Sequence, residues 1–384
     1  MRLAADHLFT GIDWHSPGAV VVDDGRVTWS GPASPDDRPL HGLLMPGLVN
    51  VHAHTPMTLL RGLGDGLPTG QWLQQVIWPR EAELTLDDIR TGMRLGAAEL
   101  LANGITTSVE MYFAPDVIGE VAADVGLRCV LTPPILSGAS VGLLGSLDEQ
   151  FDGVERSIER WDGHPLVTVG IGPHSAYMLD DDALRRAAEL ADRHELLIHI
   201  HLAEQHDEPP AVARLDDLGL LGPRTLAAHG VWLTRDDIAL LSQRGVAIAH
   251  CPVSNARHAS GLAPVTELLA AGIRVGLATD GPVSDPRLDL FDAMREAQRL
   301  ARLRELEADR LAATEVLHLA TVGSADAIGR PDLGRLTPGS AADIIRVEVP
   351  PPSSEAAPPA HLVDRASGAD VRDVWVAGAL VSQR

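Results

Sequence analysis

This chain of 384 residues contains no lysine. All 31 residues in its Lys and Arg total are arginines. The absence excludes a Walker-type phosphate loop, a lysine Schiff base and a carboxylated lysine that bridges two metal ions. A bridging Glu or Cys is not formally excluded. Any metal site in this chain is therefore expected to hold one ion.

Cysteines and long apolar runs are also scarce. Cys129 and Cys251 are the only cysteines, and their spacing fits neither a disulfide framework nor a Cys-x-x-Cys motif, so both are expected to be reduced thiols. The first residues lack a basic start followed by an apolar run, and no later run of about 18 apolar residues occurs. We expect a cytoplasmic protein with no membrane partner.

Positive charge is in deficit, and the formal net charge is −22. Such a balance argues against binding to a nucleic-acid backbone and against attraction to an anionic membrane surface. The expected partner is a small-molecule substrate. The sequence leaves a homo-oligomer open.

Both ends of the chain contain short stretches of residues that favour β-strands. Residues 3–32 suggest hairpin strands, and residues 342–347 and 371–378 suggest further strands. The segment 349–354 between the last two is too rich in proline to pair in a sheet. We predict one small composite β-domain built from residues 1–45 and 335–384.

Between these ends, short apolar runs that close on polar residues alternate with segments of helical period, which is typical of a parallel sheet covered by helices. The expected strands are 48–54, 105–111, 129–133, 167–172, 197–201, 225–229, 247–251 and 275–280, and the expected helices include 87–102, 181–194, 235–244 and 264–271. Eight such units predict an α/β fold, a (β/α)8 TIM barrel over residues 46–334. A doubly wound open sheet is disfavoured because no Gly-x-Gly-x-x-Gly turn follows the first strand.

Potential metal ligands stand at the ends of several predicted strands, where the reactive groups of such a barrel gather. His52 and His54 close the first strand, and because side chains alternate along a strand they share one face and can reach one ion. His201 closes the fifth strand, His229 the sixth and Asp280 the eighth. The predicted ligands are His52, His54, His201 and Asp280.

Three histidines and one carboxylate suit one zinc ion whose sphere a water completes, although iron or manganese stays open. Zinc lowers the pKa of a bound water to about 7. Glu204, three residues after His201, is placed to move a proton between that water and a substrate. His229 is placed to orient the nucleophile or to stabilise charge, so Glu204, His229 and Asp280 are the candidate catalytic residues.

Other histidines have structural interpretations that are at least as good. His199 shares a face with His201 but lies deeper in the strand, and we interpret it as a packed core histidine. For His250 and His258, on or just after the seventh strand, a structural interpretation is at least as good as a functional one.

The motifs resemble the amidohydrolase superfamily, in the branch that contains S-adenosylhomocysteine, methylthioadenosine and adenosine-type deaminases together with triazine chlorohydrolases. The resemblance rests on Pro-Gly-Leu-Val-Asn-Val-His-Ala-His at 46–54, His-Leu-Ala-Glu at 201–204, Ala-His-Gly-Val at 228–231 and Thr-Asp-Gly at 279–281. It implies the same barrel, composite β-domain, four metal ligands and catalytic partners. It further implies that Trp72, Glu81 and His174 contact the base and ribose of a nucleoside.

Segments 55–68, 108–113 and 131–134 look most similar to actinobacterial aminodeoxyfutalosine deaminases of menaquinone synthesis. That substrate carries a benzoate, for which Arg61 and Arg257 are candidate guanidinium partners. Cys251 and Arg257 depart from the Asn and Lys that are commoner in the segment His-Asn-Pro-x-Ser-Asn-x-Lys, which puts the identity of the substrate in doubt.

The leading hypothesis is therefore a zinc-dependent hydrolytic deaminase of a 6-aminopurine nucleoside, with S-adenosylhomocysteine or methylthioadenosine as alternative substrates to aminodeoxyfutalosine. The same machinery acting on a cytosine or guanine derivative or a chlorotriazine is the runner-up. A non-catalytic, metal-stabilised barrel is disfavoured because neither Glu204 nor His229 is needed to hold an ion. Segments 56–83 and 136–147 are lid candidates by position.

Overall fold

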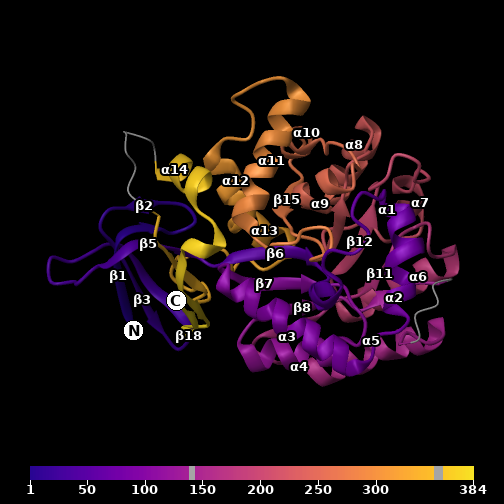
Figure 1. Cartoon of the computed structure of the whole chain (residues 1–384), viewed down its shortest axis with the longest axis horizontal. Helices are drawn as coiled ribbons and strands as arrows, with labels where there is room; N and C mark the ends of the chain where they lie inside the picture. The colour runs from indigo at the N-terminus through magenta and orange to yellow at the C-terminus, as the bar shows by residue number, and fades with distance from the viewer. Residues whose placement is uncertain (138–142, 350–357) are drawn as a thin grey trace.

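The computed structural model describes residues 1–137, 143–349 and 358–384. The middle of the second lid candidate, residues 138–142, lies outside the described residues, as do residues 350–354 of the proline-rich segment. Figure 1 shows the two ends of the chain side by side in one β-rich part, with the strands and helices of the central segment in a second, larger part.

The β-rich part is an eight-stranded sheet formed by both ends of the chain. Its order is β18-β17-β16-β5-β1-β3-β4, with β2 paired to β1, and β5 joins the two contributions because it pairs parallel to β1 and antiparallel to β16. The domain boundaries at residues 45 and 335 stay a prediction. The strands are β1 (Arg2–Phe9), β2 (Trp14–His15), β3 (Gly18–Asp23), β4 (Arg26–Pro32), β5 (Leu40–Pro46), β16 (Ile344–Val347), β17 (Val371–Val376) and β18 (Ala379–Gln383).

The central segment contains two four-stranded parallel sheets, ordered β10-β8-β7-β6 and β12-β13-β14-β15. Each of the eight predicted strand segments overlaps one of these strands, so the predicted α/β class with parallel strands is confirmed. A short parallel pair is formed by β9 (Pro134–Ile135), which lies between β8 and β10 in the sequence, and β11 (Gly172–Pro173), which follows β10. The long strands are β6 (Leu48–Ala53), β7 (Ile105–Glu110), β8 (Arg128–Leu131), β10 (Val167–Val169), β12 (Ile198–Leu202), β13 (Thr225–His229), β14 (Ala247–His250) and β15 (Arg274–Leu277).

Single parallel bridges connect the edges of the two sheets. Ile171 pairs with Ile198 at one seam, and Ala53 pairs with Asp280 at the other. The second bridge brings the carboxyl end of β6 beside the residues that follow β15. Closure of the two sheets into one continuous barrel ladder stays a prediction.

Helices follow most strands, and their ends obey local capping chemistry. Thr85 and Asp88 form a capping box at the start of α3, and Thr234 and Asp237 form one at α8, which ends at Gly245 with a φ of 72°. The predicted helices 181–194 and 235–244 are confirmed as α6 and α8. The longer helices are α3 (Leu86–Ala102), α4 (Pro115–Val125), α5 (Leu147–Trp161), α6 (Asp181–His194), α8 (Arg235–Arg244), α11 (Leu290–Glu305), α12 (Ala313–Ala320) and α14 (Pro358–Arg365).

Shorter helical turns fill the connections at the carboxyl ends of the strands and elsewhere. Four of them follow β6 in succession and fall within the lid candidate 56–83 or at its edge. They are η1 (Thr55–Leu60), α1 (Thr69–Trp72), η2 (Leu73–Ile77) and α2 (Trp78–Glu81). The others are α7 (Val212–Asp217), α9 (Pro252–Arg257), α10 (Val265–Ala270), α13 (Val322–Ala327) and η3 (Gly368–Asp370).

Two buried features fix the terminal sheet against the parallel strands. Gly47 joins β5 to β6, and a Cβ at this position would lie 2.1 Å from Thr106 Oγ1, so only glycine fits. Arg128 on β8 donates from Nε and Nη2 to the two carboxylate oxygens of Asp343, at 2.9 and 3.0 Å, and both side chains are buried. The bidentate geometry satisfies charges that would be costly to bury alone.

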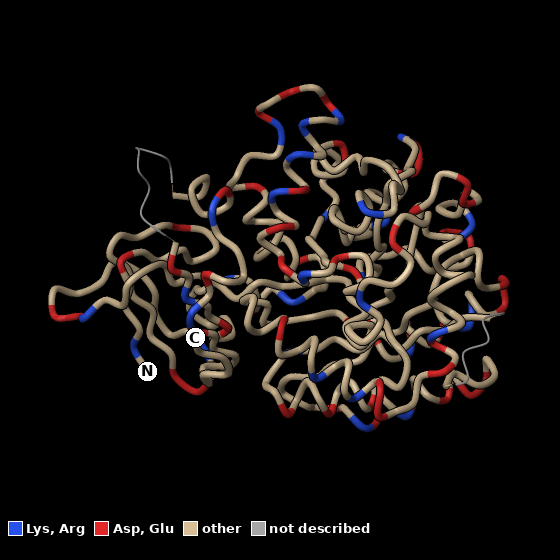
Figure 2. Tube along the Cα trace, viewed as in Figure 1, with Lys and Arg blue, Asp and Glu red and all other residues tan. Residues whose placement is uncertain are grey.

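Charged residues lie mainly on the outer helices and loops. Figure 2 shows acidic residues distributed over both parts of the molecule with arginines among them. No helix within the described ranges is long and apolar enough to cross a membrane.

Candidate active site

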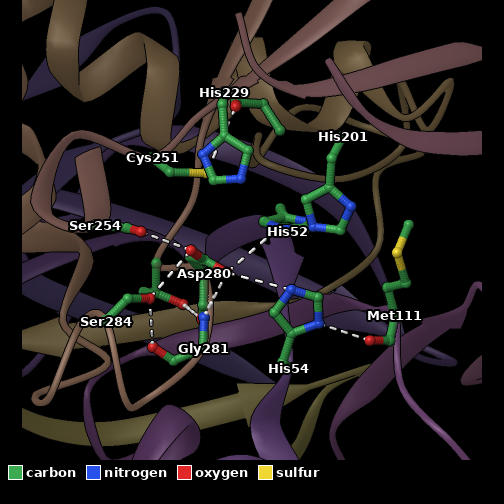
Figure 3. Close-up of polar contacts among 12 residues, drawn as sticks. His52, His54, Met111, His201, His229, Cys251, Ser254, Asp280, Gly281 and Ser284 are labelled. Atoms are coloured by element: carbon green, nitrogen blue, oxygen red, sulfur yellow. Dashed lines mark hydrogen bonds and ion pairs between the residues drawn. The ribbon is translucent and has the colours of Figure 1, made fainter. Parts of the chain in front are cut away.

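Three histidine rings and one carboxylate converge at the carboxyl ends of the parallel strands (Figure 3). The potential ligand atoms of His52, His54 and His201 all lie within 4.8 Å of one another. Asp280 Oδ1 lies 3.3 Å from His52 Nε2 and 3.2 Å from His54 Nε2. The structure thus brings together the four side chains that the sequence predicts as metal ligands.

Hydrogen bonds fix the orientation of two of these rings. His54 Nδ1 lies 2.6 Å from the Met111 carbonyl oxygen, and His201 Nδ1 lies 2.9 Å from the His174 carbonyl oxygen. A carbonyl oxygen only accepts, so each Nδ1 must carry the proton and donate it. Each Nε2 then keeps its lone pair and faces the centre of the cluster, as a metal-binding imidazole requires.

A buried chain of polar groups fixes the third ring. The Thr132 hydroxyl donates to the Glu110 carbonyl oxygen at 3.0 Å, so it accepts from His199 Nδ1 at 2.9 Å. His199 Nε2 is then an acceptor for His52 Nδ1 at 2.8 Å. His52 Nε2 is left as a fully buried nitrogen without a hydrogen-bond partner. An orphaned lone pair at this place is what a bound cation would satisfy.

His199 is therefore more than the packed core histidine that the sequence suggested. It is fully buried, as expected, but it lies directly behind a potential ligand and sets its tautomer. The His-x-His spacing of His199 and His201 on β12 was the available signal, because the alternation of side chains places both on the face toward His52.

Asp280 is held as an anion from several sides. Its Oδ2 accepts the hydroxyls of Ser254 at 2.6 Å and Ser284 at 3.0 Å, and its Oδ1 accepts the Gly281 amide at 2.8 Å (Figure 3). Burial opposes ionisation, but the two hydroxyls and the amide all donate to the Asp280 carboxylate, which favours its charged form.

Two of the three histidine ligands, in contrast, are kept neutral, whereas for His54 the contact with Asp280 outweighs burial and raises the pKa. Burial lowers the pKa of His52 to about 4 and lowers that of His201 well below its ordinary value. Neutral rings beside an ionised carboxylate form a donor set for a divalent cation.

Glu204 and His229 stand beside this cluster. Glu204 Oε2 lies 3.9 Å from His229 Nε2, and Glu204 Oε1 accepts from the Thr69 hydroxyl at 3.2 Å. His229 Nδ1 lies 3.0 Å from Asn255 Oδ1, which leaves Nε2 directed toward Glu204. His229 and Asp280 both have left-handed backbone, with φ of 74° and 64°. Such strain costs about 1–3 kcal/mol per residue and clusters at functional sites.

A pocket opens over these groups. Of the predicted substrate residues, Trp72, Glu81 and His174 line it. Burial raises the pKa of Glu81 to about 7. The remaining wall is mostly apolar and aromatic, and includes Met57, Leu73, Ile77, Trp78, Tyr112, Phe113 and Tyr177. Seven of the pocket residues, from Met57 to Glu81, come from the lid candidate 56–83, which forms one wall.

The structure does not bring Arg61 or Arg257 to this pocket. Arg61 donates from both terminal nitrogens to Glu99, with the shorter contact at 2.7 Å, and Arg257 Nη2 lies 2.9 Å from Asp65. Each guanidinium already has a carboxylate partner, which the sequence pattern could not reveal. Neither is among the described residues of the pocket lining.

Sequence reasoning also missed the residues that hold the catalytic groups in place. Ser254 and Asn255, adjacent in the segment after β14, bind Asp280 and His229 respectively. Thr69 reaches Glu204 from the connection after β6. The Ser-Asn pair stands inside the seventh-strand motif, which was the only signal available for it.

Comparisons with known proteins agree with this geometry. Residues 43–381 match the model of the amidohydrolase family. A 5′-deoxyadenosine deaminase from Methanothermobacter thermautotrophicus is 38% identical, with 95% of this chain and 89% of the relative covered. A 5-methylthioadenosine/S-adenosylhomocysteine deaminase from Syntrophobacter fumaroxidans is 37% identical, with 96% and 88% covered.

Among solved structures, an adenosine deaminase from Xanthomonas campestris with bound zinc superposes with a TM-score of 0.94 and 33% identity, covering 99% of this chain and 92% of that one. A zinc complex of an atrazine chlorohydrolase from Arthrobacter aurescens gives 0.89 and 25% identity, covering 100% and 95%. The resemblance to the amidohydrolase superfamily and its adenosine-type deaminase branch is confirmed.

The hydrogen bond from His52 to His199 yields a first prediction. Replacing His199 with Ala should weaken zinc binding by about 10- to 100-fold, because the ring of His52 loses the partner that fixes its tautomer. Chelator competition measures the affinity. His250→Ala is the matched control, because His250 is equally buried on the next strand but one and neither ring nitrogen has a partner. Equal zinc affinity in both variants would show that His199 is only a packing residue.

Proposed function

This chain belongs to the amidohydrolase family, and from that premise we propose that it is a zinc-dependent enzyme that hydrolytically deaminates a 6-aminopurine nucleoside. Its relatives are hydrolytic deaminases, and the chain is a metal-dependent aminohydrolase of the same kind. The observation that carries the proposal is the position of Glu204. Its carboxylate lines the pocket together with His54, His201, His229 and Asp280.

The ion is assigned to His52, His54, His201 and Asp280. The orphaned Nε2 of buried His52, the fixed tautomers of all three rings and the ionised Asp280 suit zinc, which takes nitrogen and oxygen ligands. When bound, the ion supplies the positive charge that makes a water nucleophilic near neutral pH.

Proton transfer is assigned to Glu204. As the oxygen of water bonds to carbon 6 of the purine, Glu204 accepts a proton and delivers it to the neighbouring ring nitrogen. The second proton of the water leaves with the amino group as ammonia, so the products are the inosine-type nucleoside and NH₃. The Thr69 hydroxyl holds one carboxylate oxygen of Glu204, which leaves the other free to move the proton.

His229 is assigned to the developing charge. Its Nδ1 proton is held by Asn255, and its Nε2 lies on the same side of the pocket as Glu204. A ring in this position can orient the attacking water and stabilise the charge that forms on oxygen.

The pocket wall fits a nucleoside. Trp72 and the neighbouring aromatic residues supply flat apolar surface for a purine. Glu81 and His174 supply polar atoms for the ribose and base. These three contacts are carried over from the family resemblance, and the pocket lining supports them.

The finer substrate prediction is aminodeoxyfutalosine of menaquinone synthesis, and it rests on the motif resemblance alone. The proposed guanidinium partners of its benzoate, Arg61 and Arg257, are paired with Glu99 and Asp65 away from the pocket. Relatives named as 5′-deoxyadenosine and 5-methylthioadenosine/S-adenosylhomocysteine deaminases make those nucleosides the alternative substrates.

Two other functions are less well supported. The atrazine chlorohydrolase has the same fold as this chain. However, loss of chloride needs a proton shuttle less than loss of ammonia does, and Glu204 is placed as such a shuttle. A binding protein without catalysis would need neither Glu204 nor His229 beside a complete ligand set.

A substrate panel tests the proposal. We expect zinc-loaded protein to release ammonia from 6-aminopurine nucleosides with a kcat/KM well above that for free adenine, cytosine or guanine. The panel contains 5′-deoxyadenosine, methylthioadenosine, S-adenosylhomocysteine, adenosine and aminodeoxyfutalosine, and chloride release from a chlorotriazine is followed in parallel. Turnover of the chlorotriazine or a free base above every nucleoside would refute the nucleoside assignment.

Glu204→Gln tests the assigned proton shuttle. The variant should retain its metal and lose turnover by at least about a hundredfold, because the amide cannot accept and return the proton. Metal content and ammonia release are measured on the same samples. Glu83→Gln, at an exposed carboxylate beyond α2, is the control and should keep wild-type turnover. A fully active Glu204→Gln enzyme would mean that another group carries the proton.

A further inference from the structure

The loop that carries Glu204 leaves β12 through a strained turn. Ala203 has a φ of 50°, in the left-handed region that residues with a Cβ rarely adopt. The Ala203 carbonyl accepts the amides of Val231 at 3.0 Å and Trp232 at 2.9 Å, which ties one side of the turn to the loop after β13. The amides of the turn itself need a separate acceptor.

Glu208 supplies that acceptor. Its Oε1 accepts the Ala203 amide at 3.1 Å, and its Oε2 accepts the amides of Glu204 at 2.9 Å and Gln205 at 3.5 Å. Three successive amides around one carboxylate form an anion nest, and hydrogen bonds to a charged acceptor are stronger than neutral ones. Burial raises the pKa of Glu208, while these amides oppose the shift.

Glu208 does not reach the substrate pocket. It lines a separate cavity on the outer side of the turn, together with Gln205, His206 and Trp232. The side chain of Glu204 points the other way, to Thr69 and His229 in the pocket. The backbone of Glu204 is therefore held from behind by one carboxylate while its own carboxylate faces the site.

We propose that Glu208 is a positioning residue that aims the Glu204 carboxylate, by binding the amides of residues 203–205 and stabilising the left-handed turn. This inference rests on the proposed function, because it gives Glu204 the role of proton carrier. A displacement of about 1 Å at a catalytic group can cost about a hundredfold in rate. Glu208 is then expected to affect kcat only by positioning Glu204.

A double-mutant cycle separates this role from simple loop stability. In the wild-type background, Glu208→Ala should lower kcat by about 10- to 100-fold, with KM within about threefold and zinc content unchanged. In the Glu204→Gln background, where the shuttle is already lost, the same change should cost less than about threefold. Glu208→Gln keeps the shape and one acceptor oxygen, so it should fall between wild type and Glu208→Ala.

Asp289→Ala is the matched control. Asp289 is a buried carboxylate that, like Glu208, accepts backbone amides, those of Phe291 at 2.9 Å and Gly368 at 2.8 Å, but it caps α11. Its loss should lower thermal stability while kcat stays within about threefold of wild type.

Hydrogen exchange gives a readout that does not depend on the substrate. Peptides spanning residues 203–205 should exchange faster in Glu208→Ala and Glu208→Gln and should be unchanged in Asp289→Ala. Unchanged exchange there, or equal losses of kcat from Glu208→Ala in both backgrounds, would overturn the positioning role. If the wild-type enzyme released no ammonia from any nucleoside, the proposed function would be contradicted instead. The hydrogen-exchange result alone would then decide whether Glu208 holds the turn.

Discussion

The direction of three imidazole rings is the constraint on which the site depends. His54 and His201 donate their Nδ1 protons to main-chain carbonyl oxygens, and His52 donates its own to His199. Each bond leaves Nε2 unprotonated and aimed at the same point as the Asp280 carboxylate. Moving the proton of His54 or His201 from Nδ1 to Nε2 would set a carbonyl oxygen against a lone pair and put an N–H among the ligands, and an unsatisfied buried group costs about 1–3 kcal/mol. The outer partners therefore determine the chemistry of the inner ones.

Much of the fold could be predicted from the sequence because its signals are local. Apolar runs of strand length, separated by segments of helical period, identified the eight strands of the two four-stranded parallel sheets, and Thr234 with Asp237 marked the start of α8. The sequence predicted that both ends of the chain share one β-domain, but it did not predict that β5 pairs with both β1 and β16. The pairing of β5 with β16 joins residues some 300 positions apart in the sequence. The junction at Gly47 and the buried Arg128–Asp343 pair carried no local signal, since each depends on a distant neighbour.

The site also has a part that could be predicted from the sequence and a part that could not. The potential ligands could be predicted because the carboxyl ends of parallel strands meet at one edge, which gives His52, His201 and Asp280 a common location without any coordinates. The partners that orient them could not, because His199, Ser254 and Asn255 become meaningful only when their distances to a ligand or to His229 are known. Arg61 and Arg257 show the opposite error. A rare positive charge in an acidic chain suggested an anion-binding role, but each is paired with a nearby carboxylate.

One competing ligand set lies in the same place. His52, His229 and Cys251 also present ligand atoms within 4.8 Å of one another, although burial raises the pKa of the Cys251 thiol well above its ordinary value. X-ray absorption at the zinc edge of the loaded protein distinguishes the two sets. Our account predicts one zinc per chain, with nitrogen and oxygen neighbours at about 2.0–2.2 Å, three of them imidazole nitrogens. A sulfur neighbour at about 2.3 Å would contradict it, because the ion would then be held by Cys251 rather than by the His52, His54, His201 and Asp280 set.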